Sequence, residues 1–412
     1  MGAVVGLVSV MLAAAGAQGL TVNECVRLAL EHSPAARVTA WQVRSTSAEL
    51  HAALSAYSPR FLVQGRYGKS EGFDKTVTDG GSTAALVTVE ATLLDGGLRD
   101  AQFAAARARL KGTAARSKQQ RADVARAVRT AYFTALARRE EVAIHDKTSG
   151  TLRGYVALLT EQERRGLVPH NDVLRAELAA GRARTARRRA AADLRNATDL
   201  LAALTGISVP ATALIAPPQM PEVQDAAEQI DTSPIIIEAR AAAQVAHRAI
   251  DTVRSQRRET LTLTASGGVL GVHPGTTFRR NGGGQFLLGF SIPVFDGGVV
   301  AARLASAIAA ANAADASVLQ SRQTLATALS RARVEADRAQ HDLAAWRAAV
   351  DRSAENFGLM RARYVGGGDV RLLEVLDALS QFVDAQLNTQ RALLSYRVAL
   401  ATQHQILGKV TL

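Results

Sequence analysis

The sequence is poor in cysteine, aromatic residues and proline, and each shortage excludes a class of structure. Its single cysteine, Cys25, excludes an internal disulfide framework and a cysteine-based metal cluster. Aromatic residues make up only 4% of the chain, which favours closely packed, alanine-rich helices over a bulky globular core. No proline occurs in residues 60–168 or 294–412, so both stretches leave room for very long helices.

Motifs for catalysis and metal binding are also absent. The eight histidines are scattered, and the chain has no His-Glu-x-x-His motif, phosphate-binding loop or nucleophile elbow. Cys25 follows Val22-Asn23-Glu24, which does not supply the small residues that precede a lipid-anchored cysteine, so we expect a small buried side chain. The sequence therefore predicts a protein that is not an enzyme and has no catalytic residue, cofactor or metal.

Long apolar runs are confined to the start of the chain. Residues 1–17 read as the apolar region of a secretory signal peptide ending in Ala15-Gly16-Ala17, although the usual positive charges before it are missing. No other segment approaches about 18 uncharged apolar residues, the length of a transmembrane helix. Export without a membrane helix leaves secretion, the periplasm or a β-barrel in the outer membrane.

The charge balance is strongly positive. A formal net charge of +12, with many arginines in residues 107–195, is typical of some nucleic-acid-binding proteins. These arginines are spread among alanines and acidic residues along helical runs, which favours a solvated helix face instead.

A short stretch that occurs twice organises the rest of the chain. Residues 94–98 and 295–299 both contain Asp-Gly-Gly, and each copy ends an alternating run and begins a long helical run. Aspartate can cap a helix, and paired glycines permit a sharp turn, so we expect two strand-to-helix corners. Other landmarks repeat with an offset of 200 to 202, which indicates an internal duplication. The corner residues are Asp95, Gly96, Gly97, Asp296, Gly297 and Gly298.

The duplication predicts a mostly α-helical fold with a small β part, in one integrated structural unit. Repeat 1 covers residues 18–209, a proline-rich linker covers 210–231, and repeat 2 covers 232–412. In repeat 1 we expect a β-hairpin at about 60–94, a long helix at about 97–164 and a return helix at about 171–205. The counterparts in repeat 2 are about 260–295, 298–362 and 370–407.

Heptad spacing indicates coiled-coil packing in the long helices. In repeat 2, Leu325, Leu329, Ala332, Ala336, Ala339 and Leu343 begin a series with alternating steps of four and three. A helix over residues 97–164 would be about 100 Å long. It ends near Gly166 and Pro169, which force a reversal, and Asn171 or Asp172 can cap the returning helix.

The two hairpins give four strands with exposed edges. Alternating strands of about ten residues have the length needed to cross an outer membrane at a tilt. A soluble hairpin packed on helices would show the same alternation. A four-stranded membrane sheet cannot stand alone, because hydrocarbon leaves its edge groups without partners, so several chains must share one barrel. Three chains would supply twelve strands.

In its ordered and duplicated motifs the sequence resembles TolC-family outer-membrane efflux channels over essentially all of the mature chain. The motifs are Leu28-Ala29-Leu30 with Ser33-Pro34, Leu94-Asp95-Gly96-Gly97, Arg165-Gly166-Leu167 with Asp172-Val173-Leu174-Arg175-Ala176-Glu177, Val294-Phe295-Asp296-Gly297-Gly298, and Arg363-Tyr364 with Leu373-Glu374-Val375-Leu376-Asp377-Ala378. The resemblance implies a homotrimer with a 12-stranded outer-membrane β-barrel joined to a 12-helix periplasmic α-barrel. It also implies passive export in a tripartite efflux or type I secretion system.

The resemblance assigns two sets of site residues. The periplasmic tips, at which adaptor hairpins dock in the family, correspond to Arg165, Gly166, Leu167, Gly366, Gly367 and Gly368. Repeat 2 has an extra residue between Tyr364 and Glu374, and the glycines could simply form turns. The family's acidic aperture corresponds to Glu374 and Asp377, with Arg363 and Tyr364 as candidates for links that close it. Two solvent-facing acids on a helix are the plainer interpretation.

The partners implied are other copies of the chain, a periplasmic adaptor protein, an inner-membrane transporter of the RND or ABC type, and outer-membrane lipid, but no nucleic acid. The location implied is the outer membrane of a Gram-negative bacterium, with an extension into the periplasm. A periplasmic coiled-coil scaffold without a pore is the alternative, although it would not need the alternating hairpins.

Overall fold

The computed structural model describes residues 19–69, 81–217, 227–271, 282–366 and 370–410, which form long helices and one small sheet. In chain order the elements are α2 (Val22–His32), α3 (Pro34–Ser55), β1 (Arg60–Lys69), β2 (Gly81–Asp95), α5 (Leu98–Arg164), α6 (His170–Thr205), the short 3₁₀ helices η2 (Ala211–Ala213) and η3 (Ala227–Thr232), α7 (Pro234–Ser255), β3 (Thr260–Gly271), β4 (Gly282–Ser291), α8 (Val299–Val365) and α9 (Leu372–Ile406). The mostly α fold with a small β part is confirmed. The expected signal peptide, residues 1–17, lies outside the described residues.

The two halves of the chain contain the same series of elements. A helix of 22 residues, two strands, a helix of 67 residues and a return helix of 35 or 36 residues occur in the same order twice. The long helices α5 and α8 begin directly after the two Asp-Gly-Gly stretches. The duplication inferred from the sequence is therefore visible in the fold.

The chain forms two compact units, and each unit draws on both repeats. One, here called the helical unit, comprises Met1–Val38, Ser117–Pro234 and Gln323–Leu412. The other, here called the sheet unit, comprises Thr39–Arg116 and Ile235–Arg322. The long helices α5 and α8 contribute residues to both units.

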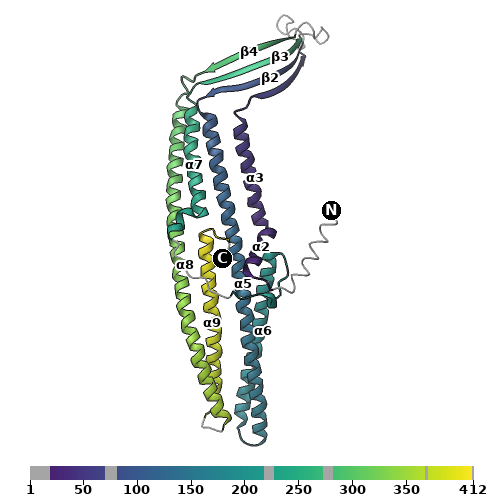
Figure 1. Cartoon of the computed structure of the whole chain (residues 1–412), viewed down its shortest axis with the longest axis vertical. Coiled ribbons are helices and arrows are strands. Elements are labelled where there is room, and N and C mark those ends of the chain that lie inside the picture. Colours follow the sequence, from purple (N-terminus) through teal and green to yellow (C-terminus); the bar gives the residue numbers. More distant parts are fainter. Residues whose placement is uncertain (1–18, 70–80, 218–226, 272–281, 367–369, 411–412) are drawn as a thin grey trace. The chain divides into compact units, whose positions relative to one another are not determined.

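The sheet unit contains a four-stranded sheet in the order β1-β2-β3-β4, and every neighbouring pair is antiparallel. Figure 1 shows β2, β3 and β4 following one another across this sheet. The central pair, β2 and β3, joins the two repeats, with Glu90 opposite Thr264 and Asp95 opposite Thr260. A bulge between Thr92 and Leu94 shifts this register. Among the described residues, strands β1 and β4 each have one neighbour, so both outer edges of the sheet are open there.

Alanine and glycine let the helices of the sheet unit pack closely. Ala101, Ala105 and Ala106 on α5 are buried. A Cβ placed on Gly112 would lie 3.1 Å from the Cβ of Ala241 on α7, which leaves little room for any larger residue. Small side chains therefore take the place of the aromatic core that the composition excludes.

One described helix, α8, is apolar enough over 18 residues to cross a membrane by length and composition alone, and 11% of that stretch is buried. This differs from the expectation of no such segment. The difference arises because α8 is rich in alanine. Alanine raises the mean hydropathy of a stretch even where isolated charged residues interrupt it.

The core of the helical unit forms where α2 and α6 pack on the middle of α5. Cys25 is fully buried there, as the sequence predicts, and burial raises the pKa of its thiol to about 11. Its helix, α2, starts with a capping box. The Thr21 hydroxyl accepts the backbone N–H of Glu24, and the Glu24 carboxylate accepts the backbone N–H of Thr21 at 2.7 Å. The same core contains Val128 and Tyr132 of α5 and Leu201 of α6.

The rest of the helical unit has coiled-coil character. Helix α9 packs on α8 through a cluster that includes Ala336, Ala339 and Tyr396 (Figure 1). The heptad series predicted for α8 is buried at its first six positions, which are Leu325, Leu329, Ala332, Ala336, Ala339 and Leu343. The next predicted position, Trp346, is 37% exposed.

Candidate functional site

The first strand-to-helix corner leads from β2 into α5. The Asp95 carboxylate accepts the backbone N–H of Gly97 at 3.1 Å and that of Arg99 at 2.9 Å, and it lies 2.8 Å from the Arg99 guanidinium. Gly96 and Gly97 have φ angles of 63° and 89°, which side chains with a Cβ rarely adopt. The aspartate thus caps α5 while the glycines make the turn.

The second corner, from β4 into α8, has the same local structure. Asp296 accepts the backbone N–H of Gly298 at 2.9 Å and that of Val300 at 2.9 Å. Gly297 and Gly298 have φ angles of 64° and 87°. The hydrogen bonds from Val300 and Gly298 hold the pKa of Asp296 below its ordinary value. Both corners therefore support a structural role for the repeated motif.

The surroundings of the two corners differ. The first corner is covered by Arg258, which precedes β3 and donates from Nη1 to the Gly96 carbonyl at 3.0 Å. The Tyr57 hydroxyl donates to Asp100 in the first turn of α5 at 2.5 Å, and the Arg99 guanidinium lies 5.1 Å from the Tyr57 ring centroid. In the second corner, a Cβ placed on Gly297 would meet no atom of the described chain within 4 Å.

The tip between α5 and α6 is a tight glycine turn with an exposed apolar side chain. Gly166 has a φ of 73°, and the backbone N–H of Leu167 donates to the Gln162 carbonyl at 2.9 Å. Leu167 is 70% exposed, and Arg165 forms an exposed ion pair with Glu161 at 2.8 Å. The glycine makes the turn, and the tip leaves one leucine and one arginine exposed to solvent.

Helix α6 starts one residue before the expected capping residues. Its N-cap is Pro169, which makes no side-chain hydrogen bond, so the expectation that Asn171 or Asp172 caps the helix is wrong. Proline has a fixed φ that suits the entry to a helix, and His170 begins the helix beside it. The His170 ring lies 2.6 Å from the Glu163 carboxylate across the turn.

The second tip is described only in part. Gly366 donates its backbone N–H to the Ala362 carbonyl at 2.9 Å, whereas Gly367 and Gly368 lie outside the described residues. Helix α9 resumes with Arg371 as its N-cap.

The acidic residues near this tip lie on the exposed face of α9. Glu374 and Asp377 are exposed, whereas Leu372 and Val375 between and beside them are buried. Asp377 accepts a hydrogen bond from the Gln381 amide at 2.8 Å. Spacing of three residues therefore puts both carboxylates on one surface, as the sequence predicts.

Arg363 and Tyr364 are the two candidates for links that close the aperture. Arg363 is exposed, whereas Tyr364 is partly buried and packs against neighbouring helices. The Tyr364 ring contacts a cluster that contains Leu159, Val173 and Leu372, and so joins α5, α6 and α9. Burial raises the pKa of Tyr364, and the nearby Asp172 carboxylate adds to this effect. Its hydroxyl is buried without a hydrogen-bond partner among the described residues.

Sequence reasoning missed a second tyrosine at this level. The Tyr155 hydroxyl on α5 is likewise buried without a partner in the described part of the chain, and burial raises its pKa. The chain has only six tyrosines, and the presence of one in an alanine-rich helix was the only sequence signal that could have pointed to Tyr155.

A groove of about 610 Å³ lies beside these residues, between α5, α6 and α9 of the helical unit. Its apolar lining comes from leucines of all three helices, and its polar lining includes His145, Arg175 and Arg182. An apolar floor with basic side chains suits an amphipathic helix with acidic residues.

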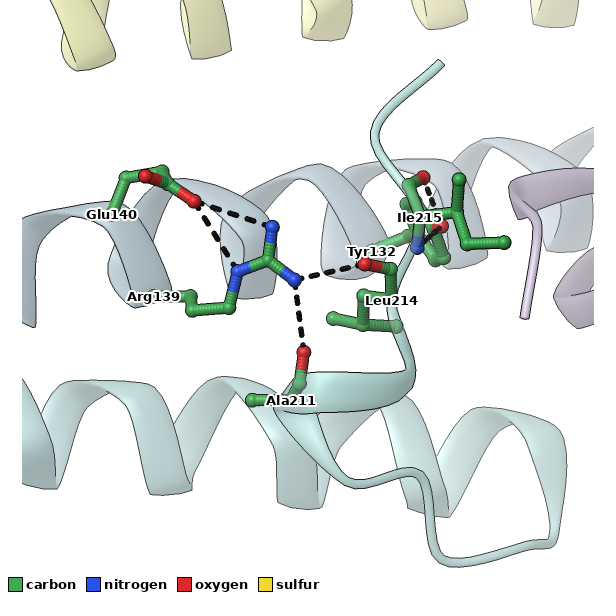
Figure 2. A network of polar contacts seen from close by, with 6 residues as sticks. All are labelled: Tyr132, Arg139, Glu140, Ala211, Leu214 and Ile215. Carbon is green, nitrogen blue, oxygen red and sulfur yellow. Dashed lines mark hydrogen bonds and ion pairs between the residues drawn. The ribbon is translucent and has the colours of Figure 1, made fainter. Parts of the chain in front are cut away.

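A polar clamp farther along α5 also escaped sequence reasoning. The Tyr132 hydroxyl lies 2.7 Å from the Leu20 carbonyl and 2.6 Å from the Ile215 carbonyl, and burial raises its pKa to about 12. The Arg139 guanidinium donates to the carbonyls of Ala211, at 3.2 Å, and Leu214, at 2.8 Å. Figure 2 shows the contacts of Tyr132 with Ile215 and of Arg139 with Ala211 and Leu214, which join α5 to the segment that follows α6. The clamp fixes the start of the inter-repeat linker.

Within the described residues, no group of three histidine, cysteine, aspartate or glutamate side chains could hold a metal ion.

Comparison with known proteins gives matches along nearly the whole chain. The family model for outer membrane efflux proteins matches residues 25–207 and again residues 227–409. Protein CyaE of Bordetella pertussis is 28% identical over 341 residues, which cover 78% of this chain and 71% of that protein. A membrane protein from Pseudomonas aeruginosa has a TM-score of 0.83 at 21% identity, over 94% of this chain and 93% of its own. The outer membrane protein VceC from Vibrio cholerae has a TM-score of 0.83 at 19% identity, over 94% and 96%. These structures share the fold, and the double match of the family model coincides with the two repeats. The chain therefore belongs to the outer membrane efflux protein family.

Proposed function

We propose that the chain is one subunit of a homotrimeric outer-membrane export channel. The observation that carries this proposal is the four-stranded antiparallel sheet, whose outer strands β1 and β4 each have only one neighbouring strand in the described part of the chain. In hydrocarbon, unpaired backbone groups are too costly to tolerate, so the sheet must close with strands from other copies. Three copies supply twelve strands, an even number and wide enough for a lumen.

The strands suit a membrane location. They contain 10 to 15 residues, and an outer-membrane strand needs about 9 to 11 at a tilt. Large apolar side chains point away from the chain, with Phe61 at 75%, Phe286 at 74% and Phe290 at 64% exposure. On a soluble sheet such exposure would be a liability, whereas lipid favours it.

The helices extend the duct on the periplasmic side. Each of α5 and α8 has 67 residues, which corresponds to about 100 Å of helix. Each long helix is joined to a shorter return helix, and three copies give a tube of twelve helical strands. The corners at Asp95 and Asp296 mark the level at which the chain leaves the membrane barrel.

The remaining partners bind at the periplasmic end. The exposed Leu167 and Arg165 at one tip, together with Gly366, Gly367 and Gly368 at the other, form the docking surface for a periplasmic adaptor protein. The nearby groove with Arg175 and Arg182 extends that surface. An inner-membrane transporter of the RND or ABC type supplies the energy, and the channel itself conducts passively without a cofactor or a catalytic step.

Glu374 and Asp377 form the aperture at this end. Repeated around a trimer, two exposed carboxylates per copy give rings of negative charge that favour cations. Arg363, also exposed, and Tyr364, packed between helices, hold the closed arrangement.

Reconstitution tests the proposal directly. The detergent-purified protein should have the mass of three chains by light scattering, and it should conduct ions in a planar lipid bilayer. A monomer, or a trimer that never conducts in any bilayer, would contradict the channel. Recovery of the protein in the soluble fraction without detergent would contradict the membrane location.

A further inference from the structure

The antiparallel pairing of β2 with β3 indicates how the open edges of the sheet, β1 and β4, can pair with other strands. This pairing connects repeat 1 to repeat 2, with Glu90 opposite Thr264 and Asp95 opposite Thr260. The counterpart of β2 is β4, at an offset of 201, and the counterpart of β3 is β1, at an offset of 200. Strand β1 of a second copy can therefore pair with β4 of the first copy in the same way that β3 pairs with β2 within one chain.

The residues after β4 lack the neighbour that their counterparts have. Residues 91–95 belong to β2 and, apart from the bulged residue 93, pair with β3, whereas residues 292–296 are not part of any strand. Phe295 is 89% exposed, while its counterpart Leu94, which lies opposite Leu261, is 43% exposed. After β4 the second repeat thus has an apolar segment, residues 292–295, that pairs with no strand among the described residues.

The same absence is seen at the corners. A Cβ on Gly96 would lie 2.5 Å from the Cβ of Arg258, a residue just before β3. A Cβ on Gly297 would meet no described atom within 4 Å. The counterpart of Arg258 is Ser58, just before β1, so the segment that would cover Gly297 is the one that enters β1 of a second copy.

Charge points to the same partner. Asp95 has its counter-ion in Arg99, but the counterpart of Arg99 is Val300, and Asp296 is left with Arg257 at 4.0 Å. The counterpart of Thr260, which lies opposite Asp95, is Arg60. Arg60 is exposed, and no ion-pair partner is found for it among the described residues.

We infer that β4 pairs with β1 of a neighbouring copy in the register of β2 and β3, so that Ser291 lies opposite Gln64 and Asp296 opposite Arg60 of that copy. The inference rests on the proposed trimer and assigns its contacts. At the first corner Asp95 pairs with Arg99 of its own chain. At the second corner Asp296 pairs instead with Arg60 of the neighbouring copy. Each corner keeps an arginine beside its capping aspartate.

Cysteine pairs test the register in intact cells. The Cys25→Ala background removes the native thiol, and Ser291→Cys with Gln64→Cys should give covalent oligomers on oxidation, resolved by electrophoresis without reductant. Ser291→Cys with Leu62→Cys is the matched control, because position 62 lies two residues away on the same side of β1. Loss of the covalent band in the first pair, or a stronger band in the control, would overturn the register.

Two further measurements separate this inference from the proposed function. Amine-reactive cross-linking of the same cells reports whether any trimer forms. A trimer with the wrong cysteine pairing contradicts the register alone, and the absence of any trimer contradicts both proposals.

A double-mutant cycle tests the ion pair. Asp296→Asn keeps the capping acceptor but removes the charge, and Arg60→Gln removes the other partner. Each single variant should lower the temperature at which the purified trimer dissociates, and the double variant should lose little more than either one. Asp95→Asn with Arg99→Gln is the control cycle within one chain. Fully additive losses for Asp296 and Arg60 would show that the two side chains do not interact.

Discussion

The hydroxyl of Tyr132 on α5 accepts the backbone N–H of Ile215 at 3.0 Å, although 83 residues separate them in the chain. The same hydroxyl is within hydrogen-bond distance of the carbonyls of Ile215 and Leu20. Leu20 also forms a parallel bridge with Leu214. One phenol therefore ties the first described residues and the linker between the repeats to the same helix.

Replacing Tyr132 with phenylalanine should destabilise the protein markedly. The change keeps the ring in the core but removes the hydroxyl that bonds the Ile215 and Leu20 carbonyls, which costs about 1–3 kcal/mol. The Ile215 N–H keeps its second acceptor, the Leu20 carbonyl, at 3.2 Å. We expect a lower midpoint of chemical denaturation for the purified protein, with an unchanged slope.

Tyr155→Phe is the matched control for this prediction. Tyr155 is also buried on α5, but its hydroxyl has no hydrogen-bond partner among the described residues. Removing a buried hydroxyl that bonds to nothing should leave stability unchanged or raise it. Equal losses for both tyrosines would show that ring packing, and not the hydrogen bonds, explains the clamp.

The repeated features were predictable from the sequence because local chemistry determines them. The corners follow from the conformations open to Asp-Gly-Gly, and the buried stripe from Leu325 to Leu343 follows from the heptad spacing. These patterns depend on neighbours within a few residues. They also gave the mostly α fold class and the duplication.

The clamp could not be predicted in the same way. Tyr132 and Arg139 bind backbone carbonyls of Ala211, Leu214 and Ile215, and any residue offers a carbonyl. The sequence therefore carries no complementary signal for the contact. Arg258 over Gly96 is a similar case, since its acceptor is a backbone carbonyl 162 residues away.

Replacing glycine with alanine should lower the stability of the protein at one position and raise it at another, depending on the backbone conformation of the glycine. Gly96 has a φ of 63° and faces the Arg258 side chain, so Gly96→Ala should destabilise the protein by about 1–3 kcal/mol through strain and displacement. Gly150 lies inside α5, with open space where a Cβ would be. Gly150→Ala should stabilise by about 0.5–1 kcal/mol, because glycine is a poor helix former. Thermal unfolding of the two variants beside the parent protein measures both. Stabilisation by Gly96→Ala would contradict the corner geometry.

Acid should weaken the helical unit through His404. Burial, with Arg129 and Lys409 nearby, lowers the pKa of His404 from 6.5 to about 4. Because the folded pKa is the lower one, the unfolded chain binds the proton first. This contribution to stability is complete above pH 6.5 and is lost as the pH falls toward 4. After allowance for solvent screening the loss is roughly 1–2 kcal/mol.

The variant His404→Gln isolates that contribution. It removes the titrating group, so the decrease in unfolding midpoint between pH 6.5 and 4 should be smaller than in the parent protein. His51→Gln, a change at an exposed histidine of α3, serves as the control and should keep the parent's dependence on pH. An unchanged pH profile for His404→Gln would mean that other groups cause the acid sensitivity.

Removing the acidic pair on α9 should change ion selectivity without unfolding the protein. Glu374 and Asp377 are exposed on α9, so Glu374→Gln with Asp377→Asn preserves shape and removes charge. In bilayers bathed by unequal salt concentrations, the reversal potential of the double variant should shift toward that of a non-selective pore, because its carboxylate rings are gone. Glu31→Gln on α2, another exposed carboxylate, should leave the reversal potential where it is in the parent channel. If the double variant selects cations as strongly as the parent, the aperture is formed by other residues.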